Sequence, residues 1–188
     1  MSKAVLISIK PERCELIENG KQTVVVIKTK PKLETPFKVY IYCSQGAMSY
    51  IGVNRAKGCP NKMRVIGEFV CDRIEEIGYS PYNHGEYICK DQSFIKQSCV
   101  PFDEMFEYLG QGFGYGWHIS DLVIYEKPKK LEDFWHIDKC PYNSEEGCTY
   151  KGYCFNAGKT NRCGSRITRP PMSWCYVDGG EDNEREAD

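Results

Sequence analysis

Two polar residues stand out because of the apolar runs beside them. Glu68 interrupts the apolar run 65–70, and an inward-facing carboxylate there could bind the exocyclic amine of a base or a cationic partner. The alternative is that Glu68 faces outward on a strand of alternating polarity. Lys10 lies at the predicted end of the first strand. It is the best partner for an inward Glu68, and an ordinary surface lysine is the alternative.

The segment 117–120, Trp-His-Ile-Ser, contains the next reactive pair. On a strand, His118 and Ser120 share one face, whereas Trp117 and Ile119 share the other. A histidine beside a serine suggests nucleophilic chemistry, but the sequence shows no third group that would orient the histidine. We therefore predict that this pair forms the polar lining of a cleft. The alternative is a histidine with a purely structural role.

Four of the eleven cysteines lie within 24 residues of one another: Cys140, Cys148, Cys154 and Cys163. This part of the chain has few aliphatic residues, so a bound metal would supply the missing stability. Four thiolates favour a closed, structural zinc site, and His136 is a possible substitute ligand. The gaps of seven, five and eight residues differ from the paired spacing of zinc ribbons. Free thiols and disulfides are therefore the alternatives.

The composition limits the classes of protein that fit. A chain of 188 residues suits one domain with a small additional lobe. The net charge is −1, so any basic face must be local. No apolar run approaches the ~18 residues of a membrane span, and no signal-peptide pattern is present. We expect a soluble, cytoplasmic protein without a membrane partner, whose cysteines are thiols or metal ligands.

Local signals predict the elements that must position these side chains. Pro11 can open a helix, because the first helical position needs no N–H donor. Asn19 and Gly20 can end it, because both tolerate positive φ. A β-branched run follows, which is typical of a buried strand. We predict strands at 5–9, 23–29, 38–43, 64–74 and 117–125, helices at 11–19 and 101–109, a long loop at 44–61 and irregular structure at 79–96.

This arrangement resembles the ASCH domain, a member of the PUA-like β-barrel superfamily. The stretches 30–43 (KPKLETPFKVYIYC), 65–72 (VIGEFVCD) and 115–128 (YGWHISDLVIYEKP) strengthen the resemblance. The closing stretch 169–177 (RPPMSWCYV) is similar to a subgroup common in phage genomes and Firmicutes-type bacteria. We expect an α+β fold with a PUA-like mixed β-barrel and flanking helices over residues 1–132. A cysteine-rich lobe (133–177) should pack back on the barrel, followed by a disordered acidic tail (178–188).

The family signature, GxKxxExR on the strand after the first helix, is degraded in this chain. Gly20 is present, but Gln22, Val25 and Ile27 stand where the family has Lys, Glu and Arg. In hydrolytic relatives a Lys, a Thr and a Glu are implicated in releasing acetate from N(4)-acetylcytidine. These positions correspond to Gln22, Val25 and, best, Glu68. Glutamine cannot serve as a nucleophile or general base, so we expect this hydrolysis to be absent or very weak.

The resemblance implies binding of RNA, a nucleotide or a modified nucleoside in the cleft between barrel and helix. Lysine could contact phosphate, the Gln22 amide could read a base edge, and Trp117 could stack on a base. Two alternatives are open: an N(4)-acetylcytidine-type amidohydrolase with Glu68 as its catalytic group, and a phage accessory module that binds a host protein. The predicted cleft residues are Lys10, Lys21, Gln22, Glu68, Trp117 and His118.

Overall fold

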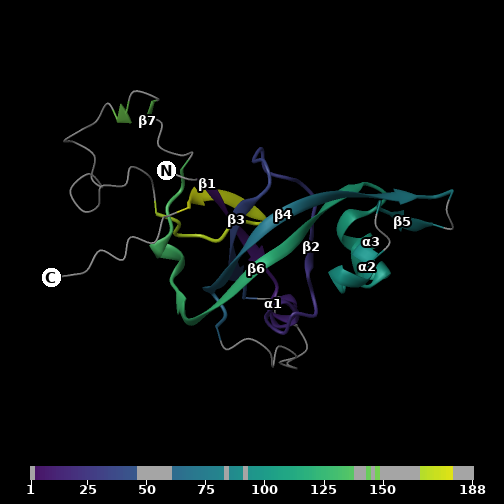
Figure 1. Ribbon diagram of the computed structural model, residues 1–188, viewed down its shortest axis with the longest axis horizontal. Helices are drawn as coiled ribbons and strands as arrows, with labels where there is room; N and C mark the ends of the chain where they lie inside the picture. Colours follow the sequence, from purple (N-terminus) through teal and green to yellow (C-terminus); the bar gives the residue numbers. More distant parts are fainter. Residues whose placement is uncertain are drawn as a thin grey trace.

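The computed structural model describes residues 3–45, 61–82, 85–90, 93–137, 143–144, 147–148 and 166–179. It has an α+β fold with one large mixed sheet and short helices beside it (Figure 1). No helix in these ranges is long and apolar enough to cross a membrane. The elements are β1 (Lys3–Ile9), α1 (Pro11–Glu18), β2 (Val24–Ile27), β3 (Phe37–Cys43), β4 (Arg64–Ser80), β5 (Glu86–Ile88), α2 (Ser93–Ser98), α3 (Phe102–Leu109), β6 (Phe113–Lys129), the 3-10 helix η1 (Leu131–Asp133), β7 (Asn143–Ser144), β8 (Gly147–Cys148) and β9 (Trp174–Asp178).

The seven-stranded sheet has the order β2-β6-β4-β3-β1-β9, and β5 pairs with β4. β1 and β3 are parallel, and the other pairs are antiparallel. In the described part of the chain no ladder joins β2 to β9, so the sheet is not closed. Side chains cross this seam instead: Trp174 Nε1 donates to Thr29 Oγ1 at 3.0 Å, and Tyr176 Oη accepts from the Lys32 N–H at 2.7 Å. The predicted α+β fold with a mixed sheet is confirmed, but the sheet has an open seam where a barrel was predicted.

Alternation along β1 divides its buried side chains between two clusters. On β1, Val5 and Ile7 belong to the main core, whereas Leu6 belongs to a second cluster on the other face. α1 adds Cys14 and Ile17 to the main core, which is why this short helix can be stable.

Trp117 of β6 lies in the main core. Its ring is fully buried, with ring centroids 5.6 Å from Phe37 and 6.1 Å from Trp174. The indole therefore ties β6 to both β3 and the C-terminal strand β9.

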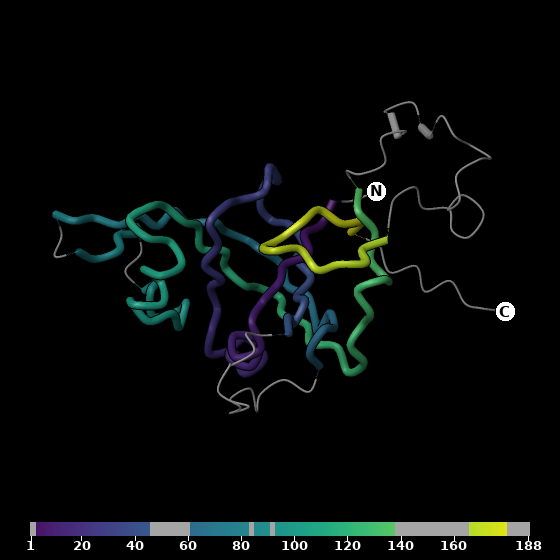
Figure 2. The backbone as a smooth tube through the Cα atoms, turned by 180° about the vertical axis from the view of Figure 1, so that it is seen from behind, coloured from purple at the N-terminus to yellow at the C-terminus, as the bar shows by residue number. Residues whose placement is uncertain are grey.

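β4 and β6 are 17 residues each, longer than the predicted strands 64–74 and 117–125. Their paired ends form an arm beside which α2 and α3 lie (Figures 1 and 2). The prediction of irregular structure at 79–96 is wrong, because this segment contains β5 and α2. The charged run 72–76 and the glycine-rich segment 110–116 suggest strand ends, but the pairing of β4 with β6 continues through both.

The predicted loop 44–61, the cysteine-rich lobe and the acidic tail lie largely outside the described residues. Within the lobe, β7 and β8 pair as a short antiparallel hairpin, and β9 at its end joins the main sheet beside β1. The side chains of Cys140, Cys148, Cys154 and Cys163 are not described, so zinc binding there stays a prediction. Across the described ranges, no group of three or more His, Cys, Asp and Glu is placed to hold a metal ion.

Gly116 of β6 packs against the ring of Phe94 of α2. A Cβ atom on Gly116 would lie 1.6 Å from Cε2 of Phe94, whose ring is fully buried. Replacing Gly116 with alanine should therefore lower the free energy of unfolding by about 1–3 kcal/mol, because overpacking displaces the helix. Urea unfolding would measure the change.

A double-mutant cycle gives the control for this prediction. Combining Gly116→Ala with Phe94→Leu should cost less than the sum of the two single changes, because the smaller side chain relieves the clash. Strict additivity of the two changes would contradict the described packing of α2 against β6.

Candidate functional site

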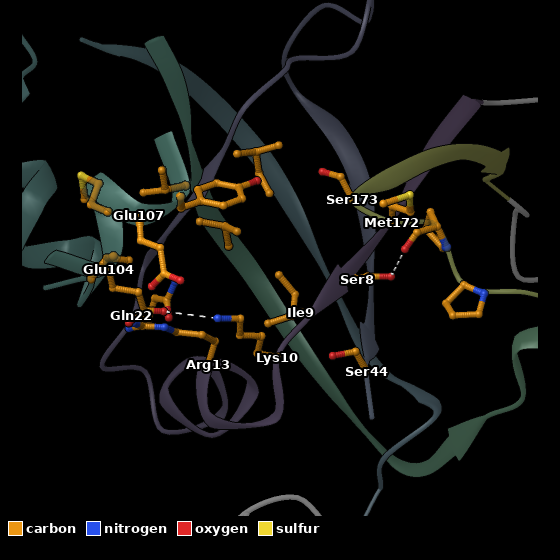
Figure 3. Close-up of a pocket in the computed structure, with 18 residues that line it drawn as sticks. Ser8, Ile9, Lys10, Arg13, Gln22, Ser44, Glu104, Glu107, Met172 and Ser173 are labelled. Atoms are coloured by element: carbon orange, nitrogen blue, oxygen red, sulfur yellow. Dashed lines mark hydrogen bonds and ion pairs between the residues drawn. The ribbon is translucent and has the colours of Figure 1, made fainter. Parts of the chain in front are cut away.

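A pocket of about 480 Å³ opens between β2, α1, α3 and the segment 170–173 that precedes β9 (Figure 3). The strand β2 supplies an apolar wall of valine and isoleucine side chains. The helices supply charged groups, which gather around Arg13 and Glu104 on one side of the pocket. Ser8 and Ser173 lie on the other side, so the pocket combines apolar surface with polar groups that converge from separate elements.

Gln22 is positioned by the turn that ends α1. Gly20 has a φ of 66°, and the Gln22 N–H donates to the Leu16 carbonyl at 3.0 Å, which folds the chain back over the helix end. The Gln22 side chain lines the pocket, is only 3% exposed, and donates through Nε2 to the Val24 carbonyl at 3.0 Å. Its Oε1 is buried and has no hydrogen-bond partner within the described structure. A buried carbonyl without a donor is unfavourable by about 1–3 kcal/mol, which makes this oxygen a candidate for binding a ligand.

The charged side of the pocket links α1 to α3. The Arg13 guanidinium donates to the Glu104 carboxylate and to the Cys99 carbonyl. Because Arg13 is 13% exposed at its side chain and committed to both partners, it acts as a structural tie. Lys10 differs: its Nζ lies 3.7 Å from Glu104 Oε1, but its side chain is 61% exposed. Such an exposed pair contributes little to stability, so Lys10 can turn toward an anionic ligand.

Tyr108 joins α3 to the opposite rim of the pocket. Burial raises the pKa of the Tyr108 phenol, while the neighbouring Lys28 backbone and Ser173 side chain oppose the rise. Ser173 Oγ is buried and makes no hydrogen bond of normal geometry to any described group. The 170–173 segment is held by Ser8, whose Oγ donates to the Pro171 carbonyl at 2.7 Å and whose N–H donates to the Ser173 carbonyl at 2.8 Å.

Replacing Tyr108 with phenylalanine should change how stability depends on alkaline pH. The folded-state pKa is raised above its ordinary value of 10.0. The unfolded chain therefore loses the phenol proton first as the pH rises, and the contribution of Tyr108 to stability is lost between these two pKa values. The Tyr108→Phe variant should lose less stability above pH 10 than the unmodified protein, as urea midpoints at neutral and alkaline pH would show. An identical alkaline decline in both proteins would contradict this.

The pocket contains two of the six predicted cleft residues, Lys10 and Gln22. Lys21 is exposed and does not line it. Trp117 is fully buried, so the prediction that it stacks on a ligand is wrong: the ring has no face open to the pocket. The β2–β6 pairing explains this, because Val25 lies opposite Trp117 and both point into the core.

Glu68 lies away from the pocket. Lys38 Nζ lies 3.1 Å from Glu68 Oε1, and the Tyr125 hydroxyl donates to Oε2. The predicted pairing of Glu68 with Lys10 is therefore wrong, since Lys10 faces Glu104 instead. A carboxylate occupied by two neighbours outside the pocket does not serve as its catalytic group.

His118 belongs to a separate charged group on β4 and β6. Its Nε2 lies 3.3 Å from Glu75 Oε1, and an Arg73 Nη atom lies 3.2 Å from its Nδ1. Ser120 Oγ donates to the Val70 carbonyl at 3.0 Å and Ser120 does not line the pocket, so the predicted lining of a cleft by His118 and Ser120 does not apply to this pocket. His118 does not line the pocket, and its contacts agree with the structural role given above as the alternative.

Several pocket residues carried no recognisable signal in the sequence. Arg13 and Glu104 are ordinary charged residues of two short helices, and only the docking of α3 beside α1 brings them together. Tyr108 and Ser173 meet only because the last segment of the chain returns to β1. Ser8 lies near the end of β1, two residues before Lys10, which the sequence did predict as a cleft residue.

Comparison with known proteins gave matches at the level of solved structures. The crystal structure of ASCH from Zymomonas mobilis aligns with a TM-score of 0.48 and 18% identity, covering 68% of this chain and 73% of that chain. Two single-residue variants of the same protein, tyrosine to phenylalanine and serine to alanine, align with TM-scores of 0.48 and 0.47, respectively. Both are 18% identical to this chain, and each alignment covers 68% of this chain. The alignments cover 76% and 74% of the two variant chains. No family model and no curated protein matches the sequence.

Proposed function

We propose that the pocket binds a nucleoside or nucleotide, without hydrolysing it. The observation that carries the proposal is Gln22, which lines the pocket and whose buried Oε1 lacks a partner in the described structure. Nucleobases present ring and exocyclic N–H groups that donate to such an oxygen. A volume of about 480 Å³ lies within the usual range for small-molecule sites.

The other groups fit the parts of a nucleotide. Val26, the half-buried residue of β2 in the lining, offers apolar surface to the face of a base. Lys10, exposed at the mouth, supports a phosphate contact. The hydroxyls of Ser8 and Ser44 could meet a ribose. The resemblance of the sequence to a nucleic-acid-associated family points to the same class of ligand.

The absence of hydrolysis is proposed from the residues of the pocket. Gln22 and Val25 stand at two positions that carry the hydrolytic groups in relatives, and both line the pocket. Neither can ionise near neutral pH. Glu68, the third candidate, is bound by Lys38 and Tyr125 outside the pocket. These residues therefore favour binding of the ligand without its hydrolysis.

Isothermal titration with nucleosides, nucleoside monophosphates and N(4)-acetylcytidine tests the proposal. We expect at least one of them to saturate a single site, with no acetate released from N(4)-acetylcytidine beyond a heat-denatured control. Failure of every compound to bind at about 1 mM, the level of a ~4 kcal/mol interaction, would overturn the binding proposal. Turnover above the control would overturn the proposed lack of hydrolysis.

A further inference from the structure

A second hollow, open and about 580 Å³ in volume, lies where β4 begins and β6 ends. We call it the basic hollow, because its lining includes Arg64, Lys127, Lys129 and Lys130. Asp133 is the acidic residue in this lining. Four cations against one carboxylate is a strong local excess in a chain whose net charge is −1.

The cations of the basic hollow are free to bind an anion. All four side chains belong to exposed residues. Lys129 Nζ lies 4.4 Å from the centre of the Tyr125 ring, and Asp133 Oδ2 accepts from the Lys130 backbone N–H at 2.9 Å. Within the described ranges, no carboxylate forms an ion pair with any of the four side chains. Gathered like charges repel one another, so an anionic partner would relieve this repulsion.

The cations are spread along the ends of two strands, the start of β4 and the end of β6. Lys127 and Lys129 are two residues apart on β6, so their Cβ atoms share a face about 7 Å apart. Lys129 lies opposite Val65, so Arg64, the neighbour of Val65, starts β4 where β6 ends, and both residues line the hollow. Positive charge spread along strand ends can contact several successive phosphates, which a single small anion does not offer.

The basic hollow and the pocket lie at the same end of the sheet. Ser44 lines the pocket, and the preceding residue, Cys43, is paired with Arg64 of the hollow. The two sites therefore include the ends of neighbouring strands, β3 for the pocket and β4 for the hollow. In Figures 1 and 2, the start of β4, the end of β6 and α1 all lie at the lower end of the molecule.

We propose that the basic hollow binds the phosphodiester backbone of a nucleic-acid strand, one nucleotide of which occupies the pocket. This inference rests on the proposed function of the pocket and names its ligand as part of a strand. RNA and DNA both present this phosphate chain, and strands of matched sequence would show which of the two the protein binds.

Fluorescence anisotropy with short labelled single strands of RNA and of DNA tests this inference. The variant Arg64→Gln/Lys127→Gln removes two cations from the hollow. The matched control Lys32→Gln/Lys96→Gln removes two exposed lysines that line neither site. We expect the hollow variant to bind the strand roughly ten-fold more weakly at low salt. Its salt slope should fall by roughly 1.4, because each cation that neutralises a phosphate of a single strand contributes ~0.7 to the slope. Its affinity for a nucleoside monophosphate should not change.

The outcomes separate the two proposals. Equal weakening in both variants, or no weakening in either, would overturn the inference about the basic hollow. Absence of any strand binding by the unmodified protein would also overturn it, and would leave an acidic protein as the partner for the hollow. If the strand binds through the hollow but no mononucleotide binds, the phosphate site stands and the proposed function of the pocket fails.

Discussion

Replacing Gln22 with methionine should weaken nucleoside binding by about ten-fold to a hundred-fold, while the fold is retained. Methionine has nearly the same length but offers no carbonyl to the ligand, so the base N–H that pairs with Oε1 would be left buried without a partner. A buried donor without a partner weakens the free energy of binding by about 1–3 kcal/mol. Isothermal titration with the ligand that binds the unmodified protein best would measure the change.

Lys21→Met is the matched control for this change. It introduces the same side chain one residue away, at an exposed position outside the pocket. We expect its affinity to equal that of the unmodified protein. The Gln22→Met variant also loses the hydrogen bond to the Val24 carbonyl, which should change the free energy of unfolding by only about 1 kcal/mol. Equal affinity of Gln22→Met and Lys21→Met would contradict the role given to Oε1.

Replacing Trp117 with alanine should lower the free energy of unfolding by about 3–5 kcal/mol, the usual effect of deleting a large aromatic side chain from a core. The ring is fully buried between Phe37 and Trp174. Urea unfolding followed by circular dichroism would measure the loss.

Trp117→Phe separates packing from hydrogen bonding. The indole Nε1 is buried without a hydrogen-bond partner in the described structure. Replacement by phenylalanine therefore reduces the side-chain volume but removes no hydrogen bond. We expect its destabilisation to be clearly smaller than that of alanine. A Trp117→Ala variant as stable as the unmodified protein, but unable to bind a nucleoside, would restore the stacking role and refute the core assignment.

The elements fixed by local chemistry were the ones that the sequence predicted well. The helix predicted at 11–19 is observed as Pro11–Glu18, because Pro11 and Gly20 mark its ends through backbone geometry alone. The same turn brings Gln22 to the pocket, so this residue and Lys10 could be found from sequence. The arm of β4 and β6 could not, because a pairing such as Glu75 with Gly116 depends on residues far apart in the chain.

The rest of the site depends on tertiary packing. Alternation correctly places Trp117 and His118 on opposite faces of β6, but it does not say which face meets a core and which meets a ligand. The pocket lies elsewhere, between α1 and α3, and the Arg13–Glu104 pair that joins these helices spans 91 residues. A charged pair at that separation has no periodic signature in the sequence.

The most direct test of nucleotide binding in the pocket is a nitrogen-edited NMR titration with a nucleoside monophosphate. If the pocket binds it, the Gln22 side-chain amide and the backbone amides of Lys10, Val25 and Ser173 should shift together and saturate at one-to-one stoichiometry. The amides around Glu68 and Tyr125 should remain in place. Saturable shifts confined to Glu68 and Tyr125, or no shifts at all, would contradict the assignment of this pocket as the ligand site.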